Sequence, residues 1–322
     1  MTRTPVFEAY WKFAAERQAV FMKRMRGEPA PWTTDPIILN YKFTNAYRAN
    51  DRVSQYLIKN VIYDGQENKR SRESTFFRIM LFKFFNRPET WELLQRNMNL
   101  EWEGFEKLNT IDHWLTRAIE DKHQIMSGAY IMPSAGAKNG VRKHTAWLKI
   151  LEKMIIGGLP TQIFGFCRTM EGAFNLMRAY PFVGNFLAYQ YVTDLNYSPL
   201  VDWSENEFTV AGPGSKRGMQ KCFRDEDMSD AGTAGIIRWM QMHQDVCFNE
   251  LGLKFERLGG ITGRPLQLID CQNIFCETDK YARVAFPEFT EGKMPTRIKA
   301  KFEASTSGPL PYFYPPKWGI KL

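Results

Sequence analysis

Residues 180–189 read YPFVGNFLAY, a Pro-x-Val-Gly turn between two predicted helices at 170–179 and 185–194. The glycine at 184 allows the backbone of such a turn to approach a DNA phosphate closely. The free N–H groups at the start of the second helix attract anions. The segment therefore predicts a helix–hairpin–helix in which Gly184 and Asn185 contact DNA.

Helical spacing dominates the rest of the chain. Apolar residues at three- and four-residue intervals predict helices at 7–26, 45–62, 74–85, 111–125 and 145–156, and another that starts at Arg87. Strand-like alternation is confined to 286–302, and 305–317 contains four prolines among Tyr and Phe. We expect a mostly α fold: a helical body at 1–290 with two lobes around one DNA-binding cleft, and an extended, Pro-rich tail at 291–322 packed on it.

A basic surplus and many aromatic residues favour a nucleic-acid partner. The 43 lysines and arginines outnumber the 35 acidic residues, which leaves a net charge of +8, and 14% of the residues are aromatic. Cations neutralise phosphates and aromatic rings stack on bases. The alternative is that a large helical core simply uses many Phe and Trp.

The sequence predicts no membrane partner. No apolar run approaches the roughly 18 residues that a spanning helix needs, and the N-terminal residues lack an apolar signal core. The five cysteines form no CxxC pair, which is typical of reduced thiols in a cytosolic protein.

Motifs for metal and nucleotide binding are missing from the sequence. The four histidines are scattered, with no HExxH pattern, and no GxxxxGK[ST] motif occurs. Residues 212–218, GPGSKRG, predict a tight turn whose backbone N–H groups and cations hold phosphate. This turn supplies Gly214, Ser215, Lys216 and Arg217 as candidates, and a plain surface turn is the alternative.

Two polar segments have helical spacing. Asn45, Arg48, Arg52 and Gln55 recur at i, i+3, i+7 and i+10, with Asp51 beside them. The same spacing aligns four residues of the second segment, which also contains Gln272: Asp270, Asn273, Glu277 and Lys280. Each set predicts one helical face that recognises a polar ligand, and a solvated face with ion pairs is the alternative.

The hairpin at 180–189 resembles that of the helix–hairpin–helix DNA glycosylase superfamily, in which a catalytic Asp follows the second helix. Asp202, in the sequence Val-Asp-Trp, lies 202 − 184 = 18 residues beyond Gly184 and matches that pattern. Phe182 replaces the usual first glycine, and Phe186 stands where lyase-type members carry a lysine, which disfavours a Schiff-base mechanism. The alternative for Asp202 is a helix N-cap.

Several separate motifs resemble the α-glutamyl/putrescinyl thymine pyrophosphorylase family, which shares its helical region with the 5-hydroxymethyluracil DNA kinases. The resemblance covers about residues 10–287. The motifs are FTNAYR at 43–48, DRVSQYLI at 51–58, FNRPETW at 85–91, GPGSKRG at 212–218, DCQN at 270–273, CE at 276–277 and DKY at 279–281.

The resemblance implies a bacteriophage enzyme in the cytoplasm of the infected host. Its substrate would be double-stranded phage DNA in which a separate kinase has acted on 5-hydroxymethyluracil to leave a pyrophosphate ester. The enzyme would replace pyrophosphate with an amine, either an amino acid such as glycine or a polyamine. No cofactor is implied, although a divalent metal on the pyrophosphate is compatible with the chemistry.

Each candidate residue receives a role in this scheme. A carboxylate must deprotonate the amine, and pyrophosphate leaves readily once its charge is neutralised. The base candidates are Asp202, Asp270 and Glu277; the substrate and pyrophosphate ligands are Arg48, Arg52, Gln55, Lys216, Arg217, Gln272, Asn273 and Lys280; the DNA contacts are Gly184, Asn185, Gly214 and Ser215. The alternatives are a base-excision glycosylase and a non-catalytic DNA-binding protein.

Overall fold

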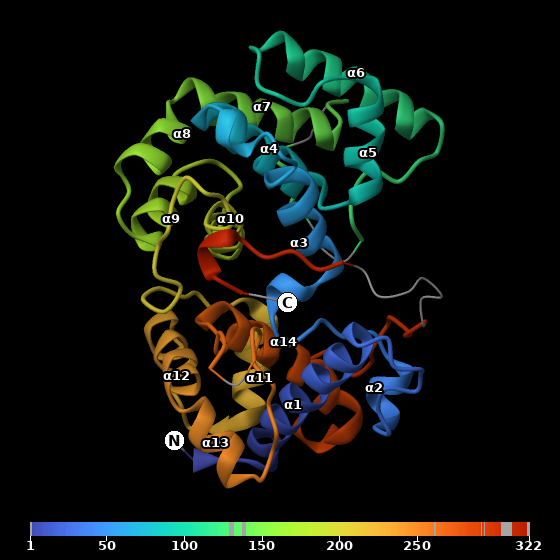
Figure 1. The fold of residues 1–322 in the computed structure, drawn as a ribbon, viewed down its shortest axis with the longest axis vertical. Coiled ribbons are helices and arrows are strands. Elements are labelled where there is room, and N and C mark those ends of the chain that lie inside the picture. Colours follow the sequence, from blue (N-terminus) through green and yellow to red (C-terminus); the bar gives the residue numbers. More distant parts are fainter. Residues whose placement is uncertain are drawn as a thin grey trace. The chain divides into compact units, whose positions relative to one another are not determined.

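The chain folds into two compact units, described here from a computed structural model. The structure describes residues 2–128, 132–136, 140–260, 262–290, 292, 294–303 and 311–320. Unit 1 comprises Met1–Asp51, Glu205–Tyr312 and Trp318–Leu322, and unit 2 comprises Arg52–Ser204 and Phe313–Lys317. Helices make up nearly all the regular structure of both (Figure 1). The predicted mostly α class is confirmed.

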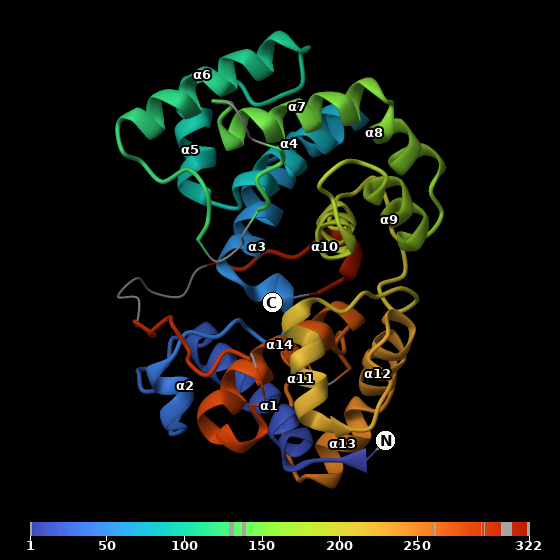
Figure 2. The ribbon, with the colours of Figure 1, turned by 180° about the vertical axis from the view of Figure 1, so that it is seen from behind.

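Unit 1 is built around one long helix, α14 (Leu268–Ala285). Helices α1 (Pro5–Met25), α11 (Pro213–Cys222) and α12 (Asp230–Met242) pack against it (Figure 2). Aromatic rings fill the core between α1 and α14, where Tyr10 lies 4.6 Å from Phe275 between ring centroids. The remaining elements are α2 (Pro36–Asn40), η1 (Arg48–Asn50), α13 (Gln244–Glu250), η5 (Pro287–Phe289) and the antiparallel strands β1 (Thr2–Arg3) and β2 (Phe223–Arg224); η6 (Pro316–Trp318) includes residues of both units.

Unit 2 surrounds α4 (Arg72–Phe85), whose residues 74–85 are all buried. Ser71 begins this helix by accepting a hydrogen bond from the Ser74 N–H, and Asn86, with φ 49°, ends it. The other elements are α3 (Arg52–Tyr56), η2 (Leu57–Ile62), η3 (Glu67–Lys69), α5 (Pro88–Asn97), α6 (Glu106–Glu120), α7 (Lys143–Ile156), α8 (Leu159–Thr161), η4 (Gln162–Phe166), α9 (Met170–Arg178) and α10 (Asn185–Leu195).

The two helices on either side of the 180–189 turn are observed. Helices α9 and α10 pack against each other, and Gly184 is the N-cap of α10. The left-handed conformation of the turn falls on Phe182, with φ 65°, rather than on Gly184, which is extended. The aromatic residue therefore takes the backbone role that a glycine fills most easily. The assignment of this turn as a DNA-contacting hairpin stays a prediction.

The predicted single helix at 45–62 is wrong. The segment contains a short 3₁₀ turn, η1, then α3 and the π-helix η2. The physical reason is that the Arg48 N–H, which would donate to the Thr44 carbonyl in such a helix, donates to the Asp270 carboxylate, and that the Thr44 carbonyl accepts from Arg17 instead. Asn45, Arg48, Arg52 and Gln55 consequently do not share one helical face.

The predicted turn at 212–218 is also wrong, because α11 begins at Pro213. Two of its glycines lie one helical turn apart against α14. A Cβ on Gly218 would lie 2.0 Å from the Phe275 carbonyl oxygen, and one on Gly214 would meet the Cys276 sulfur. The glycines therefore allow close packing of two helices rather than a turn.

Gly218→Ala is expected to destabilise unit 1, because the new methyl group cannot fit beside the Phe275 backbone and α11 must shift. Overpacking of this kind costs about 1–3 kcal/mol. The matched control is Gly235→Ala on α12, where nothing lies within 4 Å of the new Cβ and alanine should stabilise the helix slightly. Thermal melts of the two variants test this, and equal melting temperatures would refute the packing role.

The alternating stretch at 286–302 forms no strand within its described residues. It carries η5 and a single bridge between Lys301 and Tyr41. Two backbone hydrogen bonds flank that bridge, from Lys42 N–H to the Ala300 carbonyl and from Phe302 N–H to the Asn40 carbonyl. Since pairing stops there, the pattern has no partner long enough to make a sheet.

Part of the predicted tail is described, at 294–303 and 311–320. Its segment Phe313–Lys317 belongs to unit 2, and the placement of the body boundary at residue 290 stays a prediction. None of the helices in the described ranges is long and apolar enough to span a membrane.

Candidate active site

Two buried carboxylates of α14 hold the segment 43–51 in unit 1. The Asp270 Oδ1 accepts a hydrogen bond from the Arg48 N–H at 2.8 Å, and its Oδ2 accepts one from the Gln267 N–H at 2.9 Å. One α14 face also presents Glu277, which accepts from the Thr44 N–H at 3.1 Å and pairs with Lys280 at 2.5 Å. The stripe predicted on this helix thus exists, and its carboxylates meet one segment of backbone.

Asp51 ends that segment and has an unusual proton affinity. Its Oδ1 accepts a hydrogen bond from the Asn45 N–H at 2.8 Å. Burial, reinforced by the negative charge of Glu277, raises the pKa of Asp51 to about 7. Burial likewise raises the pKa of Asp270 to about 6. Two carboxyl groups therefore titrate close to neutral pH, as general bases often do.

Cations surround these carboxylates. Arg17 of α1 is 8% exposed and donates from Nε to the Thr44 carbonyl at 3.1 Å and from Nη2 to the Asn45 Oδ1 at 3.0 Å. Asn45 therefore bridges Arg17 and Asp51. We call Arg17, Arg48, Asp51, Asp270, Glu277 and Lys280 the Asp51 cluster. Sequence patterns placed Asp51 beside the 45–55 set without giving it a role, and they did not indicate Arg17 as a site residue.

The other unit 1 candidates are either paired with acidic residues or buried in the packing of α11 and α14. Lys216 pairs with Asp230 at 2.7 Å, and Arg217 pairs with the buried Asp279 at 3.2 Å. Ser215 is fully buried on α11, and its hydroxyl has no hydrogen-bond partner in the described part of the chain. Gln272 is buried and Asn273 half-buried on α14.

The remaining candidates belong to unit 2. Arg52 lies 3.5 Å from Glu89, and its side chain is 68% exposed. Gln55 donates to the Phe313 carbonyl at 3.1 Å and accepts from the Phe313 N–H at 2.8 Å. The Asp202 side chain is 79% exposed and lies outside the helices and strands. Its Oδ1 is 3.8 Å from the Lys317 ammonium nitrogen. The roles of these residues stay predictions.

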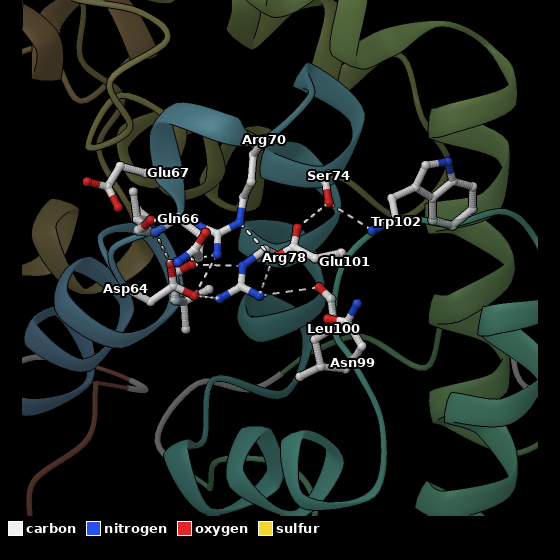
Figure 3. Close-up of polar contacts among 12 residues, drawn as sticks. Asp64, Gln66, Glu67, Arg70, Ser74, Arg78, Asn99, Leu100, Glu101 and Trp102 are labelled. Carbon is white, nitrogen blue, oxygen red and sulfur yellow. Dashed lines mark hydrogen bonds and ion pairs between the residues drawn. The ribbon is translucent and has the colours of Figure 1, made fainter.

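A second polar cluster, in unit 2, was missed from the sequence (Figure 3). It lines a cavity of 830 Å³ bordered by side chains from 64–78 and 95–102. Asp64 and Glu101 each pair with both Arg70 and Arg78, at N–O distances of 2.5–3.0 Å. The available signal was Arg78 itself, a cation inside the apolar run 74–85.

This cluster fixes the end of the π-helix η2. Arg78 donates from Nε to the Val61 carbonyl at 2.9 Å, and Arg70 donates from Nη1 to the Ile62 carbonyl at 3.0 Å. The guanidinium groups therefore satisfy backbone acceptors that a π-helix leaves open at its end. Both arginines are engaged by protein partners, which indicates a structural role.

No three His, Cys, Asp or Glu side chains in the described ranges lie where they could hold one metal ion.

Comparison with known proteins identifies the family. A model of the 5-hmdU DNA kinase helical domain matches residues 4–291. The chain is 24% identical over 318 residues to the 5-hmdU DNA kinase of Bacillus phage SP10. The aligned region covers 92% of this chain and 48% of the relative. It thus spans about half the length of that curated protein. No solved structure matches the chain. The resemblance to the helical region of these kinases is confirmed, and the chain belongs to the 5-hmdU DNA kinase helical domain family.

Proposed function

We propose that the chain acts on a thymine analogue in phage DNA and replaces the pyrophosphate of 5-pyrophosphoryloxymethyl-deoxyuridine with an amine. The bond between the 5-methylene carbon and the ester oxygen breaks, and a carbon–nitrogen bond forms. Pyrophosphate leaves with the bonding electrons, and the amine gives one proton to a base. The relative's name supports the DNA base concerned, because it names a kinase of 5-hmdU in DNA, and this reaction would start from a pyrophosphate ester of that base.

The observation that carries the proposal is the Asp51 cluster. An amine is protonated in neutral water and must lose a proton before it attacks. A carboxylate with a pKa of about 7 is ionised for a large fraction of the time at cellular pH and is basic enough to take that proton. Asp51 is therefore the base that we favour. Its pKa lies closer to neutral than that of Asp270, and it accepts one backbone N–H, whereas Asp270 accepts two and Glu277 is paired with Lys280.

The leaving pyrophosphate needs cations near the reacting carbon. Arg48 and Lys280 of the cluster are the proposed cations, and Lys280 would have to exchange Glu277 for a phosphate oxygen. Lys216 and Arg217 would likewise have to exchange Asp230 and Asp279. The turn at Gly184 and Asn185, at the start of the 11-residue helix α10, is proposed to hold a DNA phosphate. The proposed donor is a free amino acid or a polyamine.

Nucleoside mass spectrometry tests the function directly. DNA that carries the pyrophosphorylated base is incubated with the protein and a pool of amino acids and polyamines, then digested to nucleosides. We expect a new nucleoside adduct together with released pyrophosphate, and the adduct mass identifies the donor. Loss of the base without an adduct would indicate a glycosylase instead. Unchanged DNA, bound but not converted, would indicate a binding protein.

A further inference from the structure

A cavity in unit 1 adjoins the Asp51 cluster. Its volume is 430 Å³, within the usual range of small-ligand sites. Four aromatic residues line it, Trp32, Tyr41, Phe43 and Phe302, and the rest of the apolar wall is made by Val20, Ala30, Pro31, Ile38 and Leu39. No acidic residue lines it. The aromatic walls and the lack of an acidic residue in the lining therefore suit a flat, uncharged ring.

Arg17 supplies the main polar feature of this cavity. It is the one charged residue of the lining, and its side chain lies nine-tenths buried. Its Nε and Nη2 donate to the backbone and side chain of 43–45, whereas its Nη1 donates to no group of the described residues. Nη1 can therefore donate to a carbonyl oxygen of a ligand in the cavity.

Cations lie over two of the aromatic walls. The Arg24 guanidinium is 5.1 Å from the Trp32 ring centroid, and the Lys301 ammonium is 4.4 Å from that of Tyr41. Neither lines the cavity itself, but each contacts a residue that does, and neither forms an ion pair with a described residue. Their sign complements the phosphates that flank a nucleotide.

We propose that this cavity binds the pyrimidine ring of the target nucleotide after it is extruded from DNA. The aromatic walls stack on the ring, Arg17 donates to a ring carbonyl, and Arg24 and Lys301 contact the flanking phosphates. Asn45, which accepts from Arg17 and donates to Asp51, connects the cavity to the proposed base. This inference rests on the proposed function and adds the binding site of its substrate.

Calorimetric titration with 5-hydroxymethyl-2′-deoxyuridine 5′-monophosphate tests the assignment. Leu39→Trp should fill the cavity and weaken binding at least about tenfold. Ile119→Trp on α6 is the matched control, because Ile119 is 39% exposed and Leu39 is 38% exposed; its affinity should equal that of the wild type. Melting curves establish that both variants fold. Two results would overturn the assignment. One is a nucleotide affinity of Leu39→Trp within twofold of that of the wild type, and the other is no binding of the nucleotide to the wild type at millimolar concentration.

Titration with glycine and with putrescine shows whether the cavity binds the pyrimidine ring or the amine donor. Weakening of glycine or putrescine binding by Leu39→Trp, with nucleotide binding intact, would assign the cavity to the donor and overturn the inference. Adduct formation measured on the same variants distinguishes the two proposals. If Leu39→Trp loses nucleotide binding while the wild-type protein binds the nucleotide but forms no adduct, the cavity assignment is supported and the transfer reaction is refuted.

Discussion

Asp51→Asn is expected to lower adduct formation by a factor of about 10²–10⁴, because the amide cannot accept the proton of the attacking amine. In the wild type, the rate should rise with pH around a midpoint near 7, where the Asp51 carboxyl ionises. The measurement is the initial rate of adduct formation at saturating DNA and amine, from about pH 5.5 to 8.5. The variant should lose this dependence together with its activity.

Stability measurements show whether the variant has lost chemistry or fold. The folded-state pKa of Asp51 is raised, so its carboxyl contributes stability that is fully present below its ordinary pKa and lost as pH rises through about 7. Asp51→Asn removes this half-buried charge and keeps an oxygen for the Asn45 N–H. At pH 8 its melting temperature should therefore equal or exceed that of the wild type.

Asp202→Asn is the informative comparison for the base. Its carboxyl lies 79% exposed, so the substitution should not disturb folding. Retained activity in Asp202→Asn with lost activity in Asp51→Asn supports the assignment. The opposite pattern would make Asp202 the base, as the glycosylase resemblance implied, and would leave Asp51 a structural acceptor.

The α14 face was predictable because helical period alone fixes which residues share it. Asp270 and Glu277 are seven positions apart, and both do contact the same segment. The sequence did not reveal what they contact. The N–H groups of Thr44 and Arg48 bond with carboxylates more than 200 residues away, and this tertiary choice overrides the local helical pattern at 45–62.

The glycines of 212–218 show a different limit. Glycine favours turns and also permits close helix packing, and only the position of Phe275 decides between the two. The unit 2 cluster shows a third: Arg70, Arg78 and their acids are spread over 38 positions, from Asp64 to Glu101, at no helical interval that links all four. Their convergence depends on how η2, α4 and the segment after α5 pack.

Arg78→Met is expected to destabilise unit 2 by about 3 kcal/mol, because it retains the aliphatic stem but leaves Asp64 and Glu101 with one cation instead of two. The value lies at the low end for a broken buried pair, since these carboxylates are 23% and 27% exposed and keep some hydration. The Val61 carbonyl also loses its donor, so the end of η2 should loosen first.

The control is Arg52→Met. The ion pair of Arg52 with Glu89 is largely exposed, so its loss should cost about 0–1 kcal/mol. Urea denaturation followed by circular dichroism measures both, and Arg78→Met combined with Glu101→Gln should recover part of the loss. If the two single variants lose equal stability, the buried network does not support unit 2. The paired charges drawn in Figure 3 would then need another explanation.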